Sequence, residues 1–415
     1  MKYGIISTKY SIIIIFLLLL NSCKKETSIP EISIQEDVAF LADDALEGRQ
    51  TGTVGEQKAA KYIAKRFEDL GLQAKGTDGY FQTFTFKPKT DPHQEVNYTV
   101  KDGDSTITGT NVVAYLDNKV ENTIIIGAHY DHLGYGAEGS LYKGEKSIHN
   151  GADDNASGVA VLLNLAKNLI NTNTNNNYLF ITFSGEEMGL LGSNYFVKNP
   201  TIDLKTVNYM INMDMVGRLK EDKTLAVYGV GTSPRWKQTL SATNPGLKLI
   251  EKESGVGPSD HTSFYNADIP VLHFFTGQHE DYHKPTDDFD KLNFEGMTTI
   301  SNYIFDVITE LDKSGKQAFR KTKNESDETP RFKVGLGVVP DYLYDGEGMR
   351  IDGISEDKPA QKAGLQKGDI VVKLGDSSIV DMMSYMRALS VFNAGDSTKV
   401  IVKRNGEPIE FNLSF

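Results

Sequence analysis

The sequence predicts an α/β fold: a mostly parallel, mixed sheet sandwiched by helices, followed by a small β-rich domain. Three observations support this. Apolar strand-like runs recur between residues 111 and 275, amphipathic helical segments separate them, and a polar stretch at 316–330, which we interpret as an interdomain linker, precedes short strands at 331–415. Strands that alternate with helices form parallel sheets covered on both faces. A chain of 415 residues has room for two domains.

The elements of the larger domain, 34–315, follow from their periodicity. Ala60, Ile63 and Phe67 recur at helical spacing and predict a helix over 55–70. A second helix is expected over 157–170, and a last one carries apolar residues at steps of three and four from Phe294 to Leu311. Strands are predicted at 111–115, 123–128, 178–183, 207–211, 225–230 and 270–275.

The N-terminus has the pattern of a secretory signal peptide over residues 1–22. Lys2 and Lys9 precede an apolar run at 12–20 that is too short to span a bilayer. The run ends in Asn21-Ser22-Cys23, which resembles a bacterial lipobox. We therefore expect a cell-envelope lipoprotein, anchored to a membrane through a lipidated Cys23 with 23–33 as a tether. The alternative is an ordinary cleaved signal with an incidental cysteine.

The charge and the cysteine content argue against nucleic-acid binding and against a fold held by disulfides. The formal net charge is −12, without a basic patch, so nucleic acid is not an expected partner. Cys23 is the only cysteine, which rules out a disulfide within the chain.

Polar side chains with metal-binding chemistry follow the predicted strands or precede a helix. Ligand sites in open parallel sheets gather at the carboxyl edge. Each residue alone has an ordinary explanation, such as a helix cap or a solvated acidic pair. Two histidines and several carboxylates together, without thiolates, favour zinc or a similar divalent metal. The candidates are His129, Asp131, Asp153, Asp154, Glu186, Glu187, Asp214 and His283.

These motifs resemble the zinc aminopeptidases of the M28 family over roughly residues 35–312. The matching segments are Leu46-Glu47-Gly48-Arg49, His129-Tyr130-Asp131, Gly151-Ala152-Asp153-Asp154-Asn155, Ser184-Gly185-Glu186-Glu187, Asn212-Met213-Asp214 and Tyr282-His283. The resemblance implies a zinc-exopeptidase fold that binds two zinc ions. It also implies a cis peptide bond between Asp154 and Asn155.

The resemblance assigns a role to each matched residue. His129 and Asp214 would bind one zinc, Glu187 and His283 the other, and Asp154 rather than Asp153 would bridge them. Glu186 would be the general base, and Asp131 would orient His129.

Four further residues near these motifs have less certain roles. Tyr282 has a phenol that would suit a developing oxyanion, with ring packing as the alternative. His261 competes with His283 as the last ligand, and we prefer His283 because Asp287 follows it as in the family pattern. Asp260 and His149 are expected near the site without binding metal.

The C-terminal segment, 331–415, resembles a PDZ domain of the kind found with bacterial proteases. The resemblance rests on Gly335-Leu336-Gly337-Val338 and on Ala363-Gly364-Leu365-Gln366-Lys367-Gly368-Asp369. Residues Gly335 to Val338 would hold the carboxylate of a C-terminal peptide. A degenerate module that only packs on the larger domain is the alternative.

The sequence therefore predicts a metallopeptidase that removes N-terminal residues from peptides. Other M28-type exopeptidase activity, as a carboxypeptidase or dipeptidase, and single-zinc glutaminyl cyclisation are alternatives. An inactive binding protein on the same fold is the non-enzymatic alternative.

Overall fold

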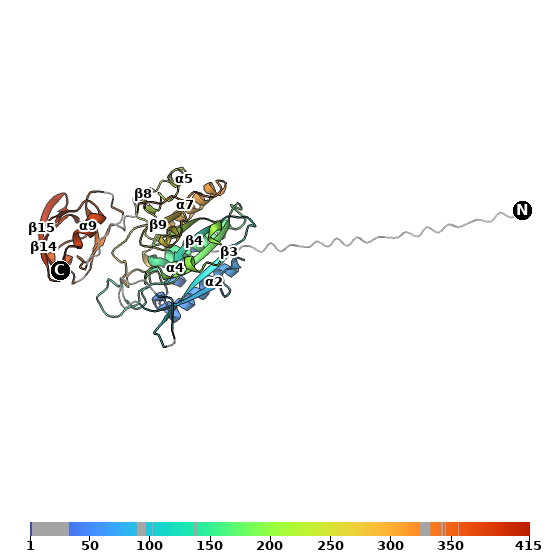
Figure 1. Cartoon of the computed structure of the whole chain (residues 1–415), viewed down its shortest axis with the longest axis horizontal. Helices are drawn as coiled ribbons and strands as arrows, with labels where there is room; N and C mark the ends of the chain where they lie inside the picture. Colours follow the sequence, from blue (N-terminus) through green and yellow to red (C-terminus); the bar gives the residue numbers. More distant parts are fainter. Residues whose placement is uncertain are drawn as a thin grey trace.

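The computed structural model describes residues 1, 33–88, 97–101, 103–136, 139–323, 333–341, 343–344, 346–355 and 357–415. Cys23, nearly all of the predicted signal peptide and tether, and linker residues 324–330 lie outside this described part. The described residues form two sheets, of nine and six strands (Figure 1). Among them, no helix has both the length and the apolar character needed to cross a membrane.

The first sheet is mixed, as predicted. Its strand order is β1-β3-β5-β4-β6-β9-β7-β8, with β2 paired to β3. The neighbours β5, β4, β6 and β9 run parallel, while β3 joins β5 and β7 joins β9 in antiparallel register. The strands are β1 (Gln73–Ala74), β2 (Phe81–Phe86), β3 (Ile107–Leu116), β4 (Thr123–His129), β5 (Asn177–Phe183), β6 (Val207–Met213), β7 (Thr224–Tyr228), β8 (Lys248–Lys252) and β9 (Val271–Phe275).

Helices cover both faces of this sheet. On one face, α1 (Ile34–Leu41), α2 (Val54–Asp69), α3 (Gly158–Leu169), α5 (Trp236–Thr243) and α7 (Phe294–Asp312) share one apolar core with the strands. On the other, α4 (Leu191–Lys198) and α6 (His261–Tyr265) share a second core. Successive strand residues alternate between the two cores, as a pleated strand requires: Ile124 and Ile126 enter the first and Ile125 the second.

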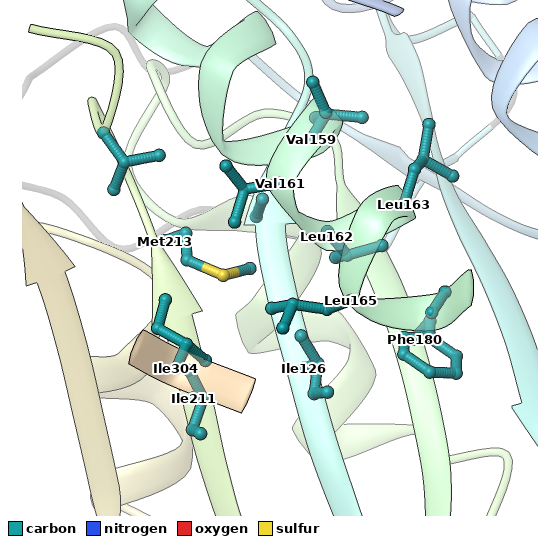
Figure 2. Packing of buried hydrophobic residues seen from close by; sticks show 14 of the residues in the cluster. Ile126, Val159, Val161, Leu162, Leu163, Leu165, Phe180, Ile211, Met213 and Ile304 are labelled. Carbon is teal, nitrogen blue, oxygen red and sulfur yellow. The ribbon is translucent and has the colours of Figure 1, made fainter. Parts of the chain in front are cut away.

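Helix α3 is the central helix of the larger core. Its side chains Val159, Val161, Leu162, Leu163 and Leu165 lie close to side chains of β4, β5 and β6 and to Ile304 of α7 (Figure 2). Each fully buried aliphatic side chain contributes about 1.5–3 kcal/mol relative to exposure. This packing fixes the N-terminal end of α3, where the candidate site lies.

The second domain has its own sheet and core. Strands β10 (Val338–Pro340), β11 (Met349–Ile354), β12 (Ile370–Leu374), β14 (Ser397–Arg404) and β15 (Glu407–Ser414) follow one another in the sheet, and β13 (Ser377–Ser378) pairs with β12. The domain also contains the helices α8 (Pro359–Ala363) and α9 (Met382–Leu389). Strand β10 forms one edge of this sheet.

The described part of the predicted linker lies against the first domain. The backbone N–H of Arg320 donates to the carbonyl of Thr232 over 2.8 Å, and that of Thr322 to the Tyr265 hydroxyl over 2.9 Å. Phe319 packs beside Tyr265, with ring centroids 5.5 Å apart. Residues 319–322 are therefore held to the first domain by hydrogen bonds and ring packing.

Candidate metal centre

The five predicted ligands come together at the carboxyl ends of the central strands. His129 ends β4, Glu187 follows β5 and Asp214 follows β6. Asp154 precedes α3, and His283 lies in the loop after β9. These residues meet because parallel neighbours end at one edge of the sheet.

Asp154 lies between two groups of ligand atoms. Its Oδ1 is 3.3 Å from His129 Nε2, and its Oδ2 is 3.3 Å from His283 Nε2. Asp214 Oδ1 is also 3.3 Å from His129 Nε2, and Glu187 Oε2 is 3.2 Å from His283 Nε2. Ligands bound tetrahedrally to zinc at the usual bond lengths lie about 3.3 Å apart. The separations thus fit two ions that share the Asp154 carboxylate.

Burial and charge also fit cations at this position. The side chains of Asp131, Asp153 and Asp287 are fully buried around Asp154, and the nearby buried Arg49 carries a single positive charge. Glu187 Oε1 is buried without a hydrogen-bond partner in the described part of the chain. A buried carboxylate oxygen in this state is costly unless a cation or proton balances it.

His132 belongs to the same group and was not among the predicted ligands. Its Nδ1 lies 2.8 Å from Glu187 Oε1, outside hydrogen-bond alignment, and 3.9 Å from Asp154 Oδ2. His132, Asp154 and Glu187 offer ligand atoms within 4.8 Å of one another, as do His129, Glu186 and Asp214. The sequence feature that could have indicated His132 as a ligand is its position three residues after His129.

Glu186 lies beside the first group. Burial raises the pKa of its carboxyl well above the usual value; the His129 charge opposes this, and Asp214 and Glu187 raise it further. Its backbone N–H donates to Asp131 Oδ1 over 3.1 Å. This contact fixes the chain at Glu186 and leaves its side chain at the pocket.

Asp131 contacts His129 differently from the expectation. The atom nearest His129 Nδ1 is the backbone carbonyl of Asp131, at 3.2 Å, while the carboxylate lies 3.7 Å away. That carboxylate instead accepts from the Thr51 hydroxyl and the Glu186 N–H. Asp131 thus connects the ends of β4 and β5 through its side chain and holds the imidazole through its main chain.

The loop before α3 separates the roles of its two aspartates. Asp153 points away from the ligand groups and accepts from the N–H of Gly217 over 2.6 Å and from the Ser157 hydroxyl. Asp287 accepts the backbone N–H groups of both aspartates, over 3.0–3.1 Å. The peptide bond between Asp154 and Asn155 is cis, as the family resemblance implied.

Arg49 explains the N-terminal motif. Its buried guanidinium donates to the carbonyls of Tyr130 over 2.8 Å, Asn150 over 2.6 Å and Gly151 over 3.0 Å, and to that of Leu41. These carbonyls flank His129 on one side and Asp154 on the other. Arg49 therefore holds two ligand-bearing loops in place.

The remaining candidates lie around the ligand groups. His261 is buried and stacks on His273 with ring centroids 4.4 Å apart, outside both ligand groups. Burial raises the pKa of Asp260 to about 7. His149 contacts Ser140 Oγ at 2.8 Å, in a neighbouring loop. Tyr282 stacks on the His283 ring with centroids 3.8 Å apart and lines the pocket.

A cavity of about 160 Å³ opens beside the ligand groups. Its lining includes the acidic residues Glu186, Glu187 and Asp214. It also includes a largely apolar set, formed by Met215, Tyr228, Pro258, His273, Phe275 and Gln278.

A mixed sheet with carboxylate and imidazole groups at its strand ends defines a protein of the zinc-exopeptidase fold. Residues 111–308 match the model of peptidase family M28, and residues 319–415 match a PDZ domain. The peptidase match covers just under half of the chain, and the PDZ match covers its C-terminal part.

Several curated relatives share part of this sequence. An alkaline phosphatase isozyme conversion protein from Escherichia coli is 30% identical over 250 residues, which cover 54% of this chain and 66% of the relative. Aminopeptidase YwaD from Bacillus subtilis is 28% identical over 48% of this chain and 43% of its own length. The chain spans about half the length of the curated relatives it matches.

Solved structures show the same fold at low identity. A zinc aminopeptidase from Bacillus subtilis aligns with a TM-score of 0.53 at 19% identity, covering 71% of this chain and all of that one. A glutaminyl cyclase from Bacteroides thetaiotaomicron aligns with a TM-score of 0.54 at 18% identity, covering 68% of this chain and 99% of that one.

Proposed function

We propose that this protein is a two-zinc aminopeptidase that hydrolyses the N-terminal residue of peptides. The observation that carries the proposal is the position of Asp154 between two imidazoles. Its Oδ1 lies 3.3 Å from His129 Nε2, and its Oδ2 lies 3.3 Å from His283 Nε2. His129 and Asp214 would hold one ion. Glu187 and His283, with His132 beside them, would hold the other.

Bound zinc would supply Lewis acidity and lower the pKa of a bound water to near neutrality. The carboxylate of Glu186 takes a proton from the attacking water and delivers it to the leaving amine. Its carboxylate lines the pocket and lies close to His129 and Asp214, which supports this assignment. The hydroxyl of Tyr282, which also lines the pocket, donates to the developing oxyanion.

The acidic and apolar residues that line the cavity favour a substrate with a free amine and an apolar first side chain. A protonated amine would be attracted to Glu186 and Asp214. Tyr228 and Phe275 would receive the side chain. The small cavity, about 160 Å³, favours the end of a chain over its interior.

The test combines zinc counting with hydrolysis of a leucine anilide and its N-acetylated analogue. We expect two zinc ions per chain, cleavage of the free-amine substrate only, and loss of activity with a chelator that zinc restores. Equal cleavage of the acetylated analogue would exclude an aminopeptidase. One zinc per chain with cyclisation of an N-terminal glutamine would instead support a glutaminyl cyclase, the fold of one structural neighbour.

The cellular location forms a separate part of the proposal. The lipobox-like Leu20-Asn21-Ser22-Cys23 supports anchoring to a membrane of the bacterial cell envelope. Radiolabelled palmitate should label the wild-type chain but not Cys23→Ala. Equal labelling of both chains would place the lipid elsewhere.

The second domain would bind a peptide with a free C-terminal carboxylate. Strand β10 forms a sheet edge directly after Gly335-Leu336-Gly337, and Leu336 anchors this segment in the domain core. A library of peptides with free and amidated C-termini tests this. Binding that does not distinguish the two forms would contradict the proposed carboxylate site.

A further inference from the structure

The second domain places the side chain of Leu343 close to residues that line the pocket. Leu343 lies in a turn just after β10 and is only 8% exposed. It shares an apolar cluster with Ala226 of β7 and Ile250 of β8, and Tyr228 and Phe275 pack against that cluster. A turn residue of one domain is thus buried by the sheet of the other.

The contact leaves no spare room at Gly277. A Cβ atom added there would lie 2.6 Å from Leu343 Cδ1, and the backbone has φ +97°. Both facts favour glycine at this position. Gly277 precedes Gln278, which lines the pocket.

The turn is held firmly within its own domain. Asp341 accepts the Leu343 N–H over 2.9 Å and the Arg350 Nε–H over 2.7 Å. The Asp341 N–H donates to the Arg350 carbonyl over 2.8 Å. Asp341 therefore connects Leu343 to β11 through hydrogen bonds.

A second contact joins the same two domains. Lys220 Nζ, just before β7, lies 3.9 Å from Asp352 Oδ2 of β11. The pair is long and its lysine is exposed, although Asp352 is buried, so it adds little energy by itself. It shows that the contact extends beyond a single side chain.

Tyr228 and Phe275 are shared between this cluster and the pocket. Both pack against the cluster that holds Leu343, and both line the cavity beside Asp154 and Glu186. Leu343 does not line the cavity itself. An effect of Leu343 on substrate therefore passes through these two aromatic side chains or through Gly277 and Gln278.

We propose that Leu343 is a positioning residue through which the PDZ domain fixes the pocket for the substrate's first side chain. The proposal rests on the proposed aminopeptidase function. Removing Leu343 frees space beside Tyr228 and Phe275, so these two side chains lose their fixed positions. A large apolar substrate side chain that contacts them loses affinity, whereas a small one is affected less.

The test compares Leu343→Ala with Leu343→Met, which keeps the volume, and with Val391→Ala on the exposed surface of the same domain. KM and kcat are measured for leucine and alanine anilides, together with zinc content. We expect Leu343→Ala to raise KM at least threefold more for the leucine substrate, with kcat and zinc content unchanged. The Met variant and Val391→Ala should behave as wild type.

Hydrogen exchange gives a readout that does not need activity. In Leu343→Ala, exchange should rise at 226–230 and 273–278 and stay unchanged in α3. An unchanged ratio of KM values, or a lower melting temperature with no change at these segments, would overturn the role of Leu343. A wild-type chain that cleaves neither anilide would refute the aminopeptidase instead, and the exchange measurement would still decide the contact.

Discussion

Replacing Asp154 with asparagine tests the shared carboxylate most directly. The change keeps the shape of the side chain but removes the charge that faces both His129 and His283 at 3.3 Å. At free zinc 100-fold above its dissociation constant, each bound ion stabilises the native state by about 2.7 kcal/mol. Losing both ions would therefore cost about 5 kcal/mol, or roughly 10 °C in melting temperature for a domain of this size.

The assay is zinc counting together with thermal unfolding in zinc and in a chelator. We expect Asp154→Asn to retain less than one zinc per chain and to melt about 10 °C below wild type in zinc. In the chelator the difference should shrink to a few degrees. Asp153→Asn is the matched control, because Asp153 is also buried but contacts Gly217, Ser157 and His279 rather than the predicted ligands. Two zinc ions on Asp154→Asn would refute the bridging role.

Three further variants test other parts of the site. Glu186→Gln should keep both zinc ions and lose about 10²–10⁴-fold in kcat; turnover near wild type with metal bound would exclude Glu186 as the base. Arg49→Met should lose at least about 3 kcal/mol of unfolding free energy in urea, because it leaves several buried carbonyls unpaired; a loss under about 1 kcal/mol would contradict its role. Burial raises the pKa of Glu56 to about 7, so wild type should lose up to about 3 kcal/mol relative to Glu56→Gln as pH rises from 4.5 to 7; pH-independent differences in urea midpoints would contradict this.

The fold and the clustering of the candidate ligands could be predicted from the sequence because both depend on strand pattern, whereas the role of each ligand came from the family resemblance. The apolar run of β4 ends at His129, which pairs in register with Phe183 at the end of β5. Glu186 therefore follows β5 at the same sheet edge, and Asp214 follows β6 there as well. Alternation and parallel pairing are enough to bring these side chains together.

The finer contacts depend on loops whose direction no periodicity records. Met215 and His283 adopt positive φ values of 52° and 54°, which turn the chain beside the ligands. His132 reaches Glu187 only because the chain after β4 bends back. Motif matching predicted Asp131 as the partner of His129, but the competition of Thr51 for its carboxylate appears only in three dimensions.

The contact of Leu343 was even less accessible to sequence reasoning. Nothing in a turn of a second domain indicates that its leucine is buried by β7 and β8 of the first. The position of residues 319–322 was likewise not predictable from the sequence. Their polar neighbours suggested a free linker, but hydrogen bonds connect them to Thr232 and Tyr265.

The number of protons released on zinc binding depends on the number of ions bound. It therefore distinguishes a two-zinc aminopeptidase from a single-zinc glutaminyl cyclase. Without metal, burial opposes charging of His129 and His283, but the surrounding carboxylates prevail. They raise the pKa of His129 well above its usual value and that of His283 to about 11. Both imidazoles are then protonated at pH 7, and each must lose its proton to bind zinc. Calorimetric titration in buffers of different ionisation enthalpy should show at least two protons released per chain; release of one would indicate that only one group binds metal.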